Sequence, residues 1–125
     1  MKKFLTVIFT LALLSGCSDD NKSNAVHIRL ANASAYDFEQ ITVNTTTGDV
    51  MYGDLKSGQL SDYKSFEVAY SYAFVELMID GEVYTLQPID YFGETPLEDG
   101  KYTYRIDAND SQERFGKLSL TLIAE

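Results

Sequence analysis

The chain has 125 residues, of which 19 are acidic and 10 are basic, so its formal net charge is −9 at pH 7. Nucleic-acid binding draws its affinity from lysines and arginines that neutralise phosphates, and a chain with this charge repels a phosphate backbone. The composition therefore excludes nucleic acid as a partner and leaves room for one folded domain.

The N-terminal residues have the pattern of an export signal. Lys2 and Lys3 supply positive charge, an apolar run follows from Phe4 to Leu14, and small residues precede Cys17. The apolar run is shorter than the roughly 20 residues that a spanning helix needs. We therefore expect a cleaved signal rather than a retained membrane helix.

The four residues Leu14-Ser15-Gly16-Cys17 resemble the lipobox of bacterial lipoproteins. The resemblance implies that the signal peptide, residues 1–16, is removed and that Cys17 is acylated, with a palmitate-type chain on its thiol and another on its new amine. An ordinary secretory signal followed by a chance cysteine is the alternative. Cys17 is the only cysteine, so no intramolecular disulfide can form. We expect an exported bacterial lipoprotein, attached to the membrane by this lipid anchor.

After Cys17 the chain is polar, and we interpret residues 17–25 as a lipidated flexible tether. Its Ser18-Asp19-Asp20 run is similar to the surface-export signal of lipoproteins in one large group of Gram-negative bacteria. That similarity implies display at the cell surface, whereas a purely solvating tether fits a periplasm-facing outer-membrane protein equally well. Removing residues 1–16 takes away two lysines and leaves 8 basic against 19 acidic residues, a formal charge of −11.

The remaining residues, 26–125, alternate between apolar and polar side chains with the period of two that is typical of strands. In the first expected strand, Val26, Ile28 and Leu30 share one face, and Asn32-Ala33-Ser34 then favours a turn. Further strands are expected around residues 41–43, 50–55 and 63–69. From residue 66 to 72 the apolar positions are even, and from 73 to 79 they are odd. Because this parity cannot change within a regular strand, we expect a bulge or a corner near residues 70–72, where the chain can pass between sheets.

Asp80-Gly81 is the strongest hairpin signal of the chain, because a type I′ turn needs positive φ at both central residues. A two-residue loop places Leu77 opposite Tyr84 and Val75 opposite Leu86. A last hairpin is expected to join a strand that has Tyr102, Tyr104 and Ile106 on one face to a strand that has leucines at 118, 120 and 122 on one face.

About eight short strands and no long helical pattern predict an all-β fold, an antiparallel two-sheet sandwich. The run from Leu97 to Tyr102, with Gly100 in its middle, resembles the entry to a late strand in immunoglobulin-like and transthyretin-like sandwiches. The whole chain is similar in its spacing to small uncharacterised lipoproteins with such folds. This resemblance implies the fold and carries no activity.

The residues of catalytic and metal sites are scarce. His27 is the only histidine and falls within the first expected strand, so neither a serine triad nor a zinc site can be assembled around it by pattern. The spacing of Asp107, Asn109 and Ser111 imitates the start of a calcium loop, but Gln112 replaces the required glycine. We predict no enzyme activity, no metal and no cofactor.

The longest expected loop runs from Pro88 to Gly100 and combines aromatic with acidic side chains. Candidate ligand-binding residues in it are Asp90, Tyr91, Phe92 and Glu94. Aromatic faces next to carboxylates suit a cationic or carbohydrate-like ligand. The alternative is that the two rings plug the open end of the sandwich.

Three functions agree with these features. The first is a non-catalytic binding or accessory module of the cell envelope that engages an envelope protein or a small ligand. The second is an acidic inhibitor or scavenger of a basic protein, since the mature charge would steer basic partners toward it. The third is a weak hydrolase that depends on carboxylates.

Overall fold

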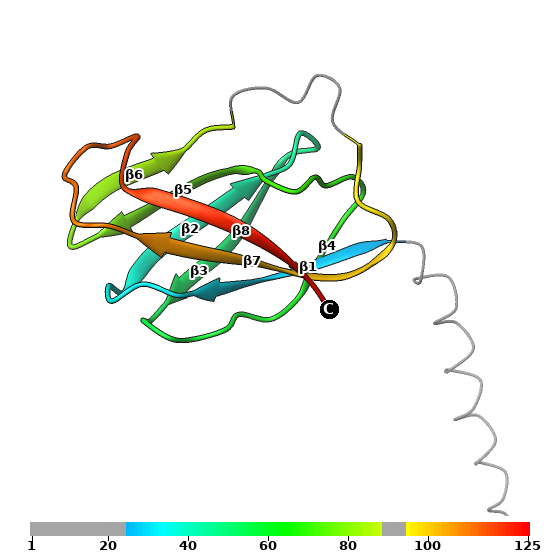
Figure 1. Ribbon diagram of the computed structural model, residues 1–125, viewed down its shortest axis with the longest axis horizontal. Coiled ribbons are helices and arrows are strands. Elements are labelled where there is room, and N and C mark those ends of the chain that lie inside the picture. Colours follow the sequence, from blue (N-terminus) through cyan, green and yellow to red (C-terminus); the bar gives the residue numbers. More distant parts are fainter. Residues whose placement is uncertain (1–24, 89–94) are drawn as a thin grey trace, which may run out of the picture.

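In a computed structural model, the structure describes residues 25–88 and 95–125. Within these ranges there is no helix, and the strands form two sheets of four, which confirms the predicted all-β sandwich (Figure 1). The strands are β1 (Val26–Asn32), β2 (Phe38–Asn44), β3 (Asp49–Leu55), β4 (Lys64–Phe66), β5 (Phe74–Ile79), β6 (Glu82–Leu86), β7 (Gly100–Ala108) and β8 (Leu118–Ala124).

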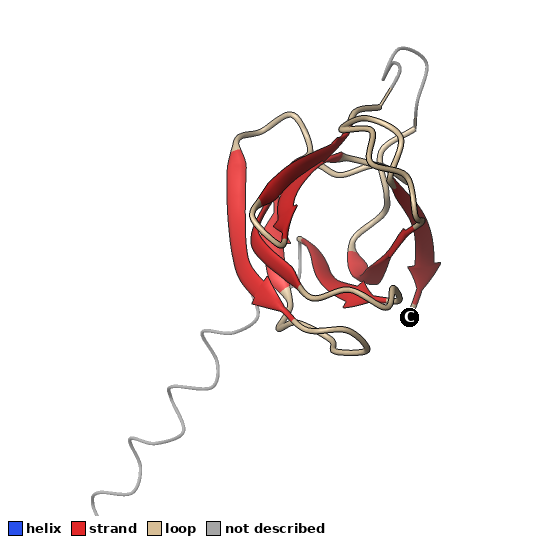
Figure 2. Cartoon of the chain, turned by 90° about the vertical axis from the view of Figure 1, so that its left-hand side faces the viewer, coloured by secondary structure: helices blue, strands red, loops and turns tan. Residues whose placement is uncertain are grey.

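One sheet has the order β4-β1-β7-β8 and the other β3-β2-β5-β6. Figure 2 shows the strands of the two sheets surrounding a shared interior. The prediction of purely antiparallel sheets was wrong for one pair, because β1 and β7 run parallel, from Val26 opposite Gly100 to Asn32 opposite Ile106. A parallel pair needs a long crossover connection, and the strands between β1 and β7 provide it. Alternating hydrophobicity predicts which face of a strand is buried, but it does not predict whether the neighbouring strand runs parallel or antiparallel.

The core lies between the sheets and is built from the inward positions that the period of two predicted. In β1, Val26, Ile28 and Leu30 are at most 2% exposed. β2 contributes Ile41 and Val43, which are both fully buried. Burying a side chain of this size stabilises the fold by about 1.5–3 kcal/mol before the loss of chain entropy is counted. The alternation of each strand therefore fixes which face it turns to the interior.

The chain passes from one sheet to the other between β4 and β5, as the change of parity predicted. β4 covers only residues 64–66 of the expected strand 63–69, and residues 67–73 form the corner. Two side chains from other elements hold its carbonyl groups: the Thr45 hydroxyl donates to Val68 O at 2.7 Å, and the Tyr104 hydroxyl donates to Tyr70 O at 2.7 Å. The parity change is therefore a sheet-crossing corner.

The hairpin at Asp80-Gly81 has the predicted turn and register. Asp80 has φ of 52° and Gly81 of 83°, as the two central residues of a type I′ turn require. Leu77 lies opposite Tyr84, and Val75 lies opposite Leu86. The last hairpin is confirmed as well, since Tyr104 pairs with Leu122 and Ile106 with Leu120.

A bulge in β2 was not predicted. The register between β2 and β3 shifts around Ile41, and the preceding Gln40 has φ of 52°. The Gln40 amide donates to Asp54 Oδ1 on β3 at 3.0 Å, which replaces the regular pairing. Because Gln favours no turn, the sequence carried no signal for this bulge.

Tyr52 of β3 closes the side of the sandwich where β3 and β4 are the edge strands. Its hydroxyl donates to Ile28 O in the opposite sheet at 2.7 Å. Burial raises the pKa of the Tyr52 hydroxyl, with a smaller contribution from Tyr104. The folded protein therefore holds this proton more tightly than the unfolded chain does.

Tyr52→Phe should lower the stability at neutral pH by about 1 kcal/mol, the value of one hydrogen bond. The stabilisation from the raised pKa is fully present below the unfolded pKa of about 10 and is lost as the pH rises toward the folded pKa. Urea unfolding at increasing alkaline pH should therefore show a shallower loss of stability in Tyr52→Phe than in the parent. Equal pH dependence of the two proteins would contradict this role.

Candidate functional site

The site residues proposed from the sequence lie outside the described residues. This holds for the lipidation residue Cys17 and for Asp90, Tyr91, Phe92 and Glu94. The structure does describe both ends of the expected loop from Pro88 to Gly100. Pro88 borders an open groove, and the Leu97 amide donates to Ala69 O at 2.8 Å.

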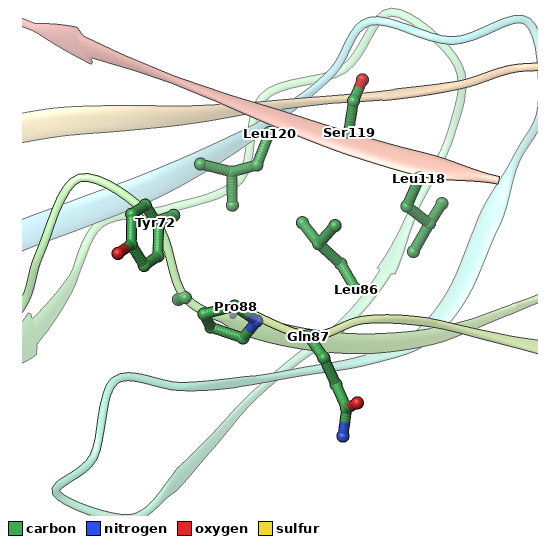
Figure 3. Close-up of a pocket in the computed structure, with 8 residues that line it drawn as sticks. Tyr72, Leu86, Gln87, Pro88, Leu118, Ser119 and Leu120 are labelled. Carbon is green, nitrogen blue, oxygen red and sulfur yellow. The ribbon is translucent and has the colours of Figure 1, made fainter. Parts of the chain in front are cut away.

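That groove has a volume of about 370 Å³ and lies between the edges of the two sheets, at β6 and β8 (Figure 3). Figure 3 shows Leu86, Leu118 and Leu120 directed into the same space, with Tyr72 and Pro88 at its border. Its volume falls within the range of small-ligand sites. The lining residues are Tyr72, Ala73, Leu86, Gln87, Pro88, Leu118, Ser119 and Leu120.

The local sequence explains why apolar side chains gather there. In β8, leucines at alternate positions point between the sheets, so Leu118 and Leu120 reach the groove from one side. Leu86 at the end of β6 reaches it from the other side, and Tyr72 belongs to the corner that precedes β5. β6 and β8 are each the last strand of a sheet, so the next position in both sheets is vacant among the described strands.

None of the lining residues is charged, and none is a histidine or a cysteine. Figure 3 shows the Gln87 and Ser119 side chains directed away from the leucines. The groove therefore offers apolar contact area and lacks the paired titratable groups that acid–base chemistry needs. The groove is therefore suited to binding an apolar group of a ligand or partner.

Lys117, which directly precedes β8, is 4% exposed. Its ammonium donates to Asn109 O at 2.7 Å and to Ser111 O at 2.9 Å. It also lies 4.5 Å from the ring centre of Tyr36 and 5.1 Å from that of Tyr84. Two carbonyls and two aromatic faces thus replace its water shell. No sequence pattern predicts this burial, because lysine side chains are normally solvated.

The residues with calcium-like spacing, Asp107, Asn109 and Ser111, are hydrogen-bonded within the protein. The carbonyls of Asn109 and Ser111 point to the Lys117 side chain. The Asn109 side chain accepts the Ser111 amide, and the Asp107 side chain accepts the amide of the next residue. No group of three potential metal ligands occurs among residues 25–88 and 95–125.

The loop 109–117 bridges the two sheets beside the groove. Arg114 O accepts the Thr85 amide of β6 at 2.8 Å. The Arg114 side chain donates to the Thr85 hydroxyl at 3.1 Å and to Glu76 Oε2 at 3.0 Å. This network covers the edge of β6 at Thr85, the residue before Leu86 of the groove lining.

His27 lies on the outer face of β1, as predicted, and its Nδ1 is 3.2 Å from the Ser65 hydroxyl. Among the described residues, no carboxylate is hydrogen-bonded to the ring. The pair lacks the third group that orients a catalytic histidine.

The described part of the chain contains no helix with the length and hydropathy to cross a membrane. No protein-family model and no curated protein matches the chain. Among solved structures, an NMR structure of a protein from Eubacterium rectale is similar, with a TM-score of 0.50 and 19% identity, and the match covers 83% of this chain and 91% of that chain. At this identity the similarity shows the fold alone: the chain is a β-rich, two-sheet protein with a bacterial structural neighbour.

Proposed function

We propose that the protein is a non-catalytic binding module of the bacterial envelope, and that its binding site is the apolar groove between β6 and β8. The observation that carries this proposal is the groove itself, which is open to solvent, lined by leucines and free of charged side chains. An open apolar pocket is the default position for a ligand or partner on a small domain. The same lining argues against the hydrolase alternative.

The lipobox-like residues 14–17 support placement at the membrane. Two or more acyl chains hold a protein stably, whereas one holds it only reversibly, so a Cys17 acylated at both its thiol and its amine would keep the domain at the outer membrane or the cell surface. The polar residues between Cys17 and β1 would act as a tether. In this arrangement the binding domain engages envelope proteins or small ligands near the bilayer.

Site-specific photo-cross-linking in intact cells tests the groove. A photoreactive phenylalanine analogue at Gln87, an exposed residue on the groove rim, should form a discrete adduct with the partner. The matched control places the same analogue at Met51, which is 63% exposed on β3, the edge strand at the other end of the sheet from β6. The Gln87 adduct should persist at high salt, because apolar burial is not screened.

Equal adducts at both positions, or none at Gln87, would contradict the groove as the site. Adducts at both positions that disappear at high salt would instead favour the second function, capture of a basic protein by the negative charge. The mature charge of −11 is the observation that supports that alternative.

A further inference from the structure

The four edge strands of the sandwich differ in how they are protected against pairing with another chain. β3 has Asp49 and Asp54 and lies beside the β2 bulge, β4 has three residues, and the β6 edge donates its Thr85 amide to Arg114 O. Charges, bulges, short length and coverage are the usual means of blocking an edge. β8 has none of them: its seven residues, Leu-Ser-Leu-Thr-Leu-Ile-Ala, include no charge and no proline, and they pair with β7 without a register shift.

The register shows which backbone groups of β8 face outward. Glu125 N donates to Lys101 O, and Asn109 N donates to Lys117 O, so odd-numbered residues of β8 exchange hydrogen bonds with β7. The N–H and C=O groups of the even-numbered residues therefore point to the free edge. These residues are Leu118, Leu120, Leu122 and Ala124.

The side chains of the leucines in this set point between the sheets, and those of Leu118 and Leu120 line the groove. In an antiparallel pair, residues directly opposite each other have their side chains on the same face. A strand added along β8 would therefore hydrogen-bond through the residues opposite the leucines and would place those residues' side chains toward the groove.

We propose, on the basis of the proposed function, that the occupant of the groove is an extended segment of a partner protein that adds to β8 as a fifth, antiparallel strand. Strand addition combines main-chain hydrogen bonds with pockets for alternate side chains. The segment has apolar residues at the alternate positions that face the groove.

The charges around the beginning of β8 indicate the kind of residue that the segment carries at the end lying there. Glu125, which follows the strand, is already paired with Arg29 at 3.5 Å, whereas the exposed Asp107, Asp110 and Glu113 lie around the beginning of β8. Arg114, the exposed basic residue of that loop, is already paired with Glu76 at 3.0 Å. An uncharged edge with acidic residues around the beginning of β8 is complementary to an apolar segment that carries lysine or arginine at the end lying there.

A single strand fits this edge better than a second copy of the whole domain. The loop 109–117 reaches from β8 across to β6 beside the groove, where Arg114 O accepts the Thr85 amide. A second copy would also bring another acidic chain, with a mature formal charge of −11, to the same place, and the two like charges would repel.

The test uses the full-length protein in detergent and a synthetic peptide of alternating valine and threonine with lysine at both ends. Two control peptides carry N-methyl groups, either on the valine amides or on the threonine amides. The parent peptide should bind and slow the exchange of the Leu120 and Leu122 amides. Methylation of the valine amides, which would face β8, should weaken binding on the order of tenfold or more, and methylation of the threonine amides should not.

Equal binding of all three peptides would show that the groove accepts apolar side chains without strand pairing, which overturns this inference and leaves the proposed function intact. Loss confined to the threonine-methylated peptide would overturn the antiparallel register. Absence of binding, or protection of these amides by self-association without peptide, would overturn the partner strand. The cross-links at Gln87 test the groove separately.

Discussion

Lys117→Met should lower the free energy of unfolding by about 3 kcal/mol, since hydrogen bonds from a charged group contribute about 1.5–3 kcal/mol each. The ammonium satisfies Asn109 O and Ser111 O and contacts the rings of Tyr36 and Tyr84. Methionine keeps most of the apolar stem and removes the charge, which leaves both carbonyls without this donor. The loop 109–117, which borders the groove, should lose order together with stability.

Urea unfolding of the parent and the variant measures this effect. The control is Lys56→Met, which removes a charge from an exposed position and should change stability by less than about 0.5 kcal/mol. If the two variants were equally stable, the contacts of Lys117 would contribute nothing to the fold.

Asn32→Ala should cost a similar amount, about 2–4 kcal/mol, because a buried polar network loses its centre. Asn32 is 1% exposed, and its amide nitrogen donates to Tyr36 O at 2.7 Å and to Leu55 O at 3.0 Å. Its Oδ1 accepts the Ser34 amide at 2.9 Å and the Ser34 hydroxyl at 2.7 Å. Alanine would leave these groups unpaired at the end of β1, where the chain turns toward β2.

Thermal unfolding, compared with that of Asn44→Ala, measures the difference. The Asn44 side chain also makes two hydrogen bonds, to Asp49 and to the Thr46 amide, but both are at exposed positions where water can replace them. Its replacement should cost less than about 1 kcal/mol. Equal melting temperatures for the two variants would contradict the network around Asn32.

The parts of the fold that the sequence predicted depend on neighbouring residues. Alternation determined the inward face of β1, Asp80-Gly81 determined a turn and its register, and the change of parity near residue 72 marked the sheet crossing. Each of these signals is contained in a few consecutive side chains, and burial enforces it because a slip of one residue would turn the apolar set to solvent.

The parts that the sequence did not predict depend on distant residues. The parallel pairing of β1 with β7 joins residues more than 70 positions apart, and alternation carries no strand direction. The groove combines Tyr72, Leu86 and Leu120 from three separate segments, none unusual by itself. Lys117 is buried because two backbone carbonyls and two rings meet around it, and residue type alone predicts the opposite.

Asn32 lies between these cases. With Ala33 and Ser34 it was predicted to end the first strand, and its side chain does bond to Ser34 as turn-forming residues do. It is also the last residue of β1 and is buried, because Leu55 O and Tyr36 O require a donor there. The sequence predicted the local hydrogen bonding with Ser34, but it did not predict the hydrogen bond to the distant Leu55.

The central claim, that the protein binds its partner through the groove between β6 and β8, is tested most directly by the ratio of photo-adducts formed from Gln87 and from Met51 in intact cells. The account predicts a discrete, salt-resistant adduct from Gln87 and little from Met51 on β3. Adducts of equal yield from both positions, or an adduct from Met51 alone, would contradict it.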